Sequence, residues 1–196
     1  LECTTKSNQQ VPEFFEQIYR STNPLSTQIQ SLAHQMNTGR NDTDPNQLVH
    51  VFYHLAENLL SLNGQTQHQL NNLNARNPGT RRELYRRVVA ARDFMQDQWE
   101  HQLSLNDVAR HACLSPFHFH RSFQAVFGDA PMLWFRKMKL EKASELLLQD
   151  NMTVSEVAMH CGFGDVFSFS KAFKRTWGIS PSGYQQKVER PYGYLA

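Results

Sequence analysis

Apolar residues recur at spacings of three and four along most of this chain, which is the pattern of amphipathic α-helices. In the N-terminal part the pattern is clearest between positions 45 and 62. It predicts a helix that begins after Asp44, a good capping residue, and ends at Asn63–Gly64. Its apolar stripe comprises Leu48, Val51, Phe52, Leu55, Leu59 and Leu62. We expect shorter helices over about residues 14–19 and 29–36, and another after Gly64.

An internal repeat dominates the C-terminal part of the chain. Residues 104–111 resemble residues 153–160 at an offset of 49, and residues 119–131 resemble residues 169–181 at an offset of 50. A solenoid needs at least three stacked repeats to bury its faces, so two copies indicate a duplicated module instead.

Each copy predicts a short helix, a tight turn and a second helix. In the first copy Ser104 caps the first helix, residues 112–115 form the turn, and Ser115–Pro116 starts the second helix. Thr153 and residues 162–164 take the corresponding places in the second copy. The second helices carry regularly spaced aromatic residues, namely Phe119, Phe123 and Phe127 in one copy and Phe169, Phe173 and Trp177 in the other. This order is that of a helix-turn-helix, whose second helix enters the major groove of DNA.

A long helix is expected to connect the two modules. Residues 131–149 begin with Pro131 and contain no internal Gly or Pro. The apolar stripe of this segment comprises Trp134, Met138, Leu140, Ala143, Leu146 and Leu147. A helix of this length spans ~28 Å, which suits two recognition helices placed in major-groove segments ~34 Å apart on one duplex. The predicted fold class is all-α, with tandem helix-turn-helix modules at about 104–127 and 153–177, a linker helix and a helical N-terminal segment.

The composition of the chain changes near residue 80. The net charge is only +2 over 196 residues, but residues 1–80 hold 4 basic and 6 acidic side chains, whereas residues 81–196 hold 16 and 12. Asn and Gln make up 21 of the first 80 residues and 9 of the other 116. Asn77–Pro78–Gly79, which we expect to stop a helix, marks the boundary. We therefore predict two units, residues 1–80 and 81–190, with the basic excess confined to the second.

The composition of the chain also excludes several classes of protein. No apolar run approaches the ~20 residues that a membrane-spanning helix needs. The three cysteines, Cys3, Cys113 and Cys161, are odd in number and far apart, and no secretory leader opens the chain. These features favour a reducing cytosolic compartment, and a start at Leu1 suggests the cut edge of a longer polypeptide.

A metal or redox site is the main alternative to a helix-turn-helix role for the histidines and cysteines of the C-terminal part. His111, Cys113, His118, His120 and Cys161 are all competent zinc ligands. However, side chains two positions apart on a helix, such as those of His118 and His120, point in different directions. We therefore expect no bound metal and no cofactor.

Residues 85–188 resemble the DNA-binding domain of the AraC/XylS family of bacterial transcription regulators. The matching strings are residues 105–112 with Leu114–Ser115–Pro116, Phe119–Arg121 with Phe123, Gly162–Phe163, Phe169–Arg175, and Gly178–Pro181 with Tyr184. Residues 81–93 are similar to the helical lead-in of many members. The resemblance implies an N-terminal region that senses an effector or mediates dimerisation, which residues 1–80 represent in part.

The resemblance also implies which residues touch DNA, because the family reads bases from the exposed faces of the third and sixth helices of the domain. The base-contacting candidates are Phe117, His120, Arg121, Phe167, Ser168 and Lys171, and the backbone-contacting candidates are Ser170, Lys174 and Arg175. Arg121 is the strongest candidate, since a guanidinium can make two hydrogen bonds to guanine. Val166 and Phe167 stand where members often have polar residues, and Lys171 where Arg is usual, so the second module is expected to rely more on the DNA backbone and on thymine methyl groups.

The function that follows is sequence-specific DNA binding in the bacterial cytoplasm, with association to the nucleoid through DNA. The expected partners are double-stranded promoter or operator DNA, RNA polymerase, a small-molecule effector and a second copy of the chain; a membrane is not expected. An activator is favoured over a repressor, and the effector, the operator and the oligomeric state stay open. Domains of this kind also occur fused to alkyl-transfer repair enzymes, but Cys3 has no nearby cluster to lower its pKa or bind zinc. We therefore predict that the chain is not an enzyme.

Overall fold

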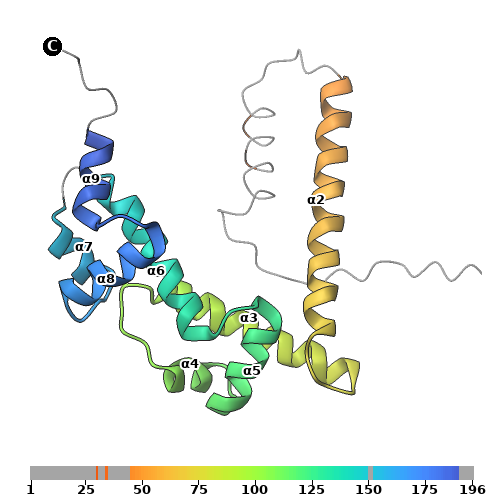
Figure 1. Ribbon diagram of the computed structural model, residues 1–196. Helices are drawn as coiled ribbons and strands as arrows, with labels where there is room; N and C mark the ends of the chain where they lie inside the picture. Colours follow the sequence, from red (N-terminus) through yellow and green to blue (C-terminus); the bar gives the residue numbers. More distant parts are fainter. Residues whose placement is uncertain (1–29, 31–33, 35–44, 150–151, 190–196) are drawn as a thin grey trace, which may run out of the picture. The chain divides into compact units, whose positions relative to one another are not determined.

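Figure 1 shows the computed structural model, which describes residues 30, 34, 45–149 and 152–189. The chain divides into two compact units, Leu1–Asn71 and Asn72–Ala196. Every regular element in the described ranges is an α-helix, which confirms the predicted fold class. Apart from two single positions, the helices expected over residues 14–19 and 29–36 lie outside the described residues, as does the cap at Asp44. None of the described helices is both long enough and apolar enough to cross a bilayer.

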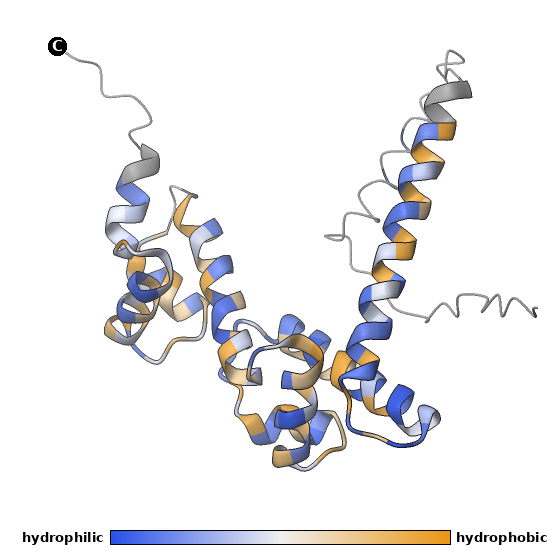
Figure 2. Cartoon of the chain, turned by 45° about the vertical axis from the view of Figure 1, so that its right-hand side comes forward, coloured by the Kyte–Doolittle hydropathy of each residue, from blue (hydrophilic) through white to orange (hydrophobic). Residues whose placement is uncertain are grey.

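Helix α2, Pro45–Asn71, is the one fully described element of the first unit. The prediction that it ends at Asn63–Gly64 and that a separate helix follows was wrong, because α2 runs through both residues without a break. Gly64 keeps a helical backbone, and a Cβ placed on it would meet nothing within 4 Å. A glycine inside a helix costs only about 1 kcal/mol unless it adopts the left-handed conformation that ends the helix. Figure 2 shows apolar and polar residues interspersed along the coloured part of α2.

The second unit begins with the first module, made of α3 (Pro78–Asp97), α4 (Leu105–His111) and α5 (Pro116–Phe127). Asn77–Pro78–Gly79, expected to stop a helix, instead starts α3, since the Asn77 side chain accepts a hydrogen bond of 2.8 Å from the Gly79 N–H. The predicted lead-in helix over residues 81–93 lies within α3. The three helices pack on one another and bury Val88, Ala91 and Met95 from α3, Val108 and Ala109 from α4, and Phe119 and Phe123 from α5.

Both predicted caps of the first module are present. Ser104 accepts a hydrogen bond from the Asp107 N–H, and the Asp107 carboxylate accepts one from the Ser104 N–H, which forms a capping box at the start of α4. Ser115 accepts from the His118 N–H at 3.3 Å, and Pro116 occupies the first turn of α5. Gly128 ends α5 with φ 82°.

Helix α6, Pro131–Leu147, is the linker helix. Its 17 residues span about 25 Å, two residues less than the predicted range. The buried face also differs from the prediction: Trp134 and Met138 are only half-buried, whereas Phe135 and Lys139 are buried. The helix packs against α3 and α5 of the first module and against the three helices of the second. It is therefore buried on more than one face, whereas the prediction assumed a single apolar stripe.

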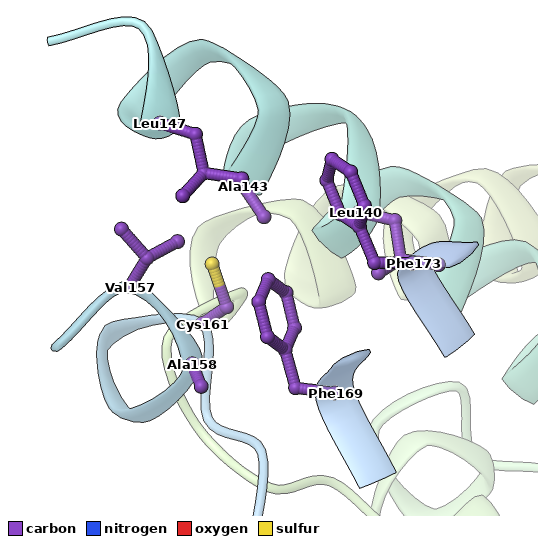
Figure 3. Packing of buried hydrophobic residues seen from close by; sticks show 8 residues of the cluster. All are labelled: Leu140, Ala143, Leu147, Val157, Ala158, Cys161, Phe169 and Phe173. Carbon is purple, nitrogen blue, oxygen red and sulfur yellow. The ribbon is translucent and has the colours of Figure 1, made fainter. Parts of the chain in front are cut away.

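The second module contains α7 (Val154–His160), α8 (Val166–Trp177) and α9 (Pro181–Glu189). Thr153 and Glu156 form a second capping box, as the repeat predicts for Thr153. Figure 3 shows the core, in which α6 faces α7 and α8. This core comprises Leu140, Ala143, Leu147, Val157, Ala158, Cys161, Phe169 and Phe173. Helix α9 was not predicted; its Tyr184 ring packs 5.4 Å from the Phe173 ring.

Candidate nucleic-acid interface

The N-terminal half of α5 presents the predicted reading residues of the first module. Phe117 is 72% exposed, although it is a large apolar side chain. The Arg121 guanidinium lies over the Phe117 ring, 5.6 Å from its centroid, and both residues are exposed. His120 is half-buried. A cation held over an aromatic face loses little solvation and keeps its N–H groups free for a second partner, so this pair presents a positioned guanidinium beside an apolar surface.

Helix α8 presents the corresponding residues of the second module, and its N-cap is one that the sequence analysis missed. Asp165 accepts hydrogen bonds from the Ser168 N–H at 2.6 Å and from the Ser168 hydroxyl at 2.7 Å. These two bonds hold the pKa of the Asp165 carboxyl below its usual value. Because the Ser168 hydroxyl donates to Asp165, its oxygen is left to act as an acceptor toward any further partner. The signal was available, since Asp three residues before Ser is a capping pattern.

The remaining predicted contacts of the second module also lie on α8. Phe167 is 78% exposed, more than any other large apolar side chain among the described residues. Lys171 is exposed as well. Lys174 and Arg175 are exposed in the last turns of α8, whereas Ser170 is half-buried. Within the described ranges, no carboxylate lies within ion-pair distance of Arg121, Lys171, Lys174 or Arg175. The cations of both reading faces are therefore available to an anionic partner.

The segment between α3 and α4 joins the two modules tightly. The buried Lys139 ammonium of α6 donates a hydrogen bond of 2.6 Å to the His101 carbonyl and lies 4.6 Å from the centroid of the Phe135 ring. Burial lowers the pKa of Lys139 from 10.5 to about 8, with the Cys161 sulfur acting in the opposite direction. A Cβ added to Gly162, in the turn of the second module, would overlap the Glu100 carbonyl oxygen and lie 2.9 Å from Lys139 Nζ.

Aromatic contacts reinforce the same junction. The Trp99 ring meets the His160 ring edge-on at 5.3 Å and packs against the core of the second module. The His160 imidazole Nε2 lies 3.6 Å from a carboxylate oxygen of Glu100. The segment 98–103 therefore connects two helices of the first module along the chain, but its side chains and backbone pack against the second module.

A cleft of about 860 Å³ opens beside this junction. It is lined by Gln102 and Leu103 of the connecting segment, by Met132, Phe135, Arg136 and Lys139 of α6, by residues 162–164, and by Ser168, Lys171, Ala172, Lys174 and Arg175 of α8. Among these described lining residues five are cationic and none is acidic. Repeat and motif comparison does not reveal this site, because it combines residues from the connecting segment, the linker helix and one module.

Two of the residues weighed as metal ligands, His111 and Cys161, contribute to the packing. The His111 ring stacks on the Phe94 ring with centroids 4.2 Å apart. Cys161 is buried in the second core, and burial raises the pKa of its thiol to about 11. Within the part of the chain that the structure describes, no three His, Cys, Asp or Glu side chains gather as metal ligands would.

Comparisons with known proteins agree on the nature of the second unit. A family model described as a helix-turn-helix domain matches residues 108–187. The MmsAB operon regulatory protein of Pseudomonas aeruginosa is 33% identical over 100 residues, which is 51% of this chain and 33% of that protein. The arabinose operon regulatory protein of Escherichia coli K12 is 29% identical over 139 residues, which is 70% of this chain and 48% of that protein. The chain thus spans between a third and a half of the length of these two relatives.

A solved structure supports the same domain. The DNA-binding domain of AdpA, a global transcriptional factor crystallised in complex with a target DNA, is 28% identical, with a TM-score of 0.51. The match covers 54% of this chain and 97% of that domain. This similarity to a complete domain agrees with the duplicated helix-turn-helix geometry of the second unit.

Proposed function

The C-terminal unit of this chain is an AraC-family DNA-binding domain, and from this premise we propose that the chain is a sequence-specific regulator of transcription. One copy of the chain places α5 and α8 in adjacent major-groove segments of the same duplex. The observation that carries this proposal is the presence of two equivalent helices, each with an exposed aromatic residue and an unpaired cation on its outer face. An exposed aromatic ring beside a cation suits a surface that is both anionic and partly apolar, such as the major groove of a duplex.

The side chains have distinct roles in this proposal. Arg121, steadied over Phe117, donates two hydrogen bonds to a guanine edge, and Phe117 itself packs on a thymine methyl group of a neighbouring pair. Phe167 makes the equivalent apolar contact from α8. The Ser168 hydroxyl already donates a hydrogen bond to Asp165, so its oxygen accepts one from the amino group of an adenine or a cytosine.

Two further residues complete the base-reading set, and three hold the backbone. His120 and Lys171 reach base edges from α5 and α8. Ser170, Lys174 and Arg175 contact phosphates and fix the register of α8 on the duplex. Because most second-module contacts go to the backbone or to methyl groups, the half-element read by α5 is expected to be the more strictly specified one.

The test is selection of duplexes from a random pool by the full chain, followed by gel-shift titration of the selected duplex and of a random 30-base-pair duplex. The selected sequence should contain two elements about one helical turn apart, and its affinity should fall as salt rises. The variant Arg121→Ala should lose discrimination at one guanine. Lys142→Ala is the matched control, since Lys142 is a partly exposed cation that is paired with Glu145 at 2.8 Å. Equal affinity for selected and random duplexes would overturn the proposal.

The regulatory outcome proposed is activation, in which the bound chain contacts RNA polymerase at a promoter and responds to a small-molecule effector sensed by the N-terminal region. A reporter with the selected element upstream of a weak promoter tests this directly. Transcription that rises with the chain present supports activation, and transcription that falls assigns repression. The proposed location is the bacterial cytoplasm, where the chain associates with the nucleoid through DNA; the named relatives from Pseudomonas aeruginosa and Escherichia coli support a bacterial setting.

We also propose that the first unit forms a homodimer through α2. This helix exposes several large apolar side chains among the described residues, namely Val49, Phe52, Tyr53 and Leu60. A second copy of the same amphipathic helix offers a complementary surface. Phe52 is 66% exposed in the structure, so its substitution tests this interface. Sedimentation equilibrium should show a dimer for the wild-type chain and a monomer for Phe52→Asp.

A further inference from the structure

The cleft between the connecting segment, α6 and α8 has a charge pattern that the recognition helices do not account for. Of its five cations, Arg136 and Lys139 come from the linker helix, and neither belongs to a reading face. Lys139 is a buried residue that lines the cleft, and its ammonium donates one hydrogen bond to the His101 carbonyl. Two of its three N–H groups therefore remain for other partners.

Pairing distinguishes the cations in the cleft from the others on the same helix. On α6, Lys137 is paired with Asp129 at 2.7 Å and Lys142 with Glu145 at 2.8 Å. Arg136, one position before Lys137, is exposed and has no carboxylate within ion-pair distance in the described ranges. Unpaired like charges converging on one cleft repel each other, and an anionic occupant relieves that repulsion.

The walls of the cleft are as informative as its charges. Phe135, Met132 and Phe163 supply apolar surface, and the cations stand around it. A sugar–phosphate backbone has this composition, with anionic oxygens on one side and the carbon framework of deoxyribose on the other. A free phosphate ion would use the cations alone and leave the apolar wall without a partner.

The position of the cleft selects DNA as the source of this backbone. Ser168 and Lys171 of the α8 reading face also line the cleft. A duplex whose bases are read by α8 therefore brings its own backbone to the rim of the cleft. If α5 and α8 lie in adjacent groove segments, as proposed above, the strand between these segments passes the junction of the two modules.

We propose that this cleft binds the DNA backbone between the two half-elements, with Arg136 and Lys139 of the linker helix contacting a phosphate there. This inference rests on the proposed function and adds a third, sequence-independent contact. Because Lys139 also fixes the segment 98–103, the contact ties the spacing of the two half-elements to the geometry of the junction.

The experiment compares the full chain with Arg136→Gln and with the control Lys137→Gln, each measured on the selected duplex and on a random 30-base-pair duplex between 50 and 200 mM salt. Both changes remove one exposed cation from neighbouring positions on α6, and the unfolding midpoint of each variant is measured in parallel. Arg136→Gln should weaken binding to both duplexes by the same factor. The slope of log affinity against log salt should become shallower by about 0.9, so that this fourfold rise in salt costs the variant about 3.5-fold less affinity than the wild type. Lys137→Gln should keep the wild-type slope.

A second measurement changes the DNA and compares the wild type with Arg136→Gln. Single phosphates between the half-elements are replaced by neutral methylphosphonates, one position at a time. At one position the substitution should weaken binding of the wild type more than binding of Arg136→Gln, because the variant has already lost the Arg136 part of the contact.

Three results would overturn the inference while leaving the proposed function intact. These are an unchanged salt slope for Arg136→Gln, a loss confined to the selected duplex, and methylphosphonate effects that are the same for both proteins at every position. Binding of a small anion such as phenyl phosphate that depends on Arg136, with DNA affinity unchanged, would also overturn it. If wild-type protein fails to prefer the selected duplex, the proposed function fails instead.

Discussion

The turn glycine Gly162 gives the sharpest test of how the two modules are joined. Its φ of 66° lies in the left-handed region, and a Cβ at this position would overlap the Glu100 carbonyl oxygen of the connecting segment. Gly178, in the same module, has a similar φ of 74°, but a Cβ there would meet nothing within 4 Å. The pair Gly162→Ala and Gly178→Ala therefore separates the backbone cost from the cost of the contact.

The expected magnitudes follow from these two environments. A non-glycine residue in the left-handed conformation costs roughly 1–2 kcal/mol, and Gly178→Ala should lower the free energy of unfolding by about that amount. Gly162→Ala carries the same backbone cost. It adds about 1–3 kcal/mol, because the segment holding Glu100 is backbone in a packed junction and cannot rotate away as a side chain can.

The assay is urea unfolding followed by far-ultraviolet circular dichroism, with both variants compared to the wild type under identical conditions. Amide hydrogen exchange in segment 98–103 provides a local readout, and exchange there should accelerate in Gly162→Ala only. If the two variants lose the same stability, the contact between Gly162 and Glu100 contributes nothing and the described junction is wrong.

Three other predictions test separate parts of the structure. Arg121→Ala should lose about 1–3 kcal/mol of discrimination at one base pair, measured by gel shift against duplexes changed at each position; a uniform loss at all positions would assign Arg121 to the backbone instead. Because burial lowers the pKa of Lys139 to about 8, from 10.5, the native state releases a proton that the unfolded chain keeps. The stability of the wild type relative to Lys139→Met should therefore rise between pH 8 and 10.5, as urea midpoints at several pH values will show; a flat difference would refute the shift. Thr153→Ala should cost about 1 kcal/mol of unfolding free energy through loss of the capping box. Since hydrogen bonds from Thr153 lower the pKa of Glu156 below 4.5, that difference should shrink as the pH falls below this value, and a difference independent of pH would mean that the carboxylate takes no part.

The internal repeat made much of the second unit predictable from sequence. Capping residues and glycines act locally, through hydrogen bonds and φ angles within a few residues of themselves. Ser104, Ser115 and Thr153 therefore start helices where their positions predict, and Gly128 and Gly178 follow the ends of α5 and α8. Aromatic residues at four-residue spacing had to share one face.

Local rules gave wrong results where a competing local interaction exists or where packing decides. Asn63–Gly64 is a good helix end only if the glycine turns left-handed, and in α2 it stays helical. Asn77 can end one helix or cap the next, and in the structure it caps α3. On α6 the buried set shifted from Trp134 to Phe135, because two modules cover this helix from different sides.

The sequence by itself determined that this chain carries two helix-turn-helix modules, because these follow from short-range periodicity and from the repeat. The candidates for reading bases came from the resemblance of these modules to the AraC/XylS family. Only the tertiary structure brought Glu100 against the turn at Gly162, buried Lys139 beneath His101, and gathered Arg136 with the cations of α8 around one cleft. These residues are separated by tens of positions and belong to different elements. Their proximity depends on how three helices and a connecting segment pack, and no spacing along the chain encodes that.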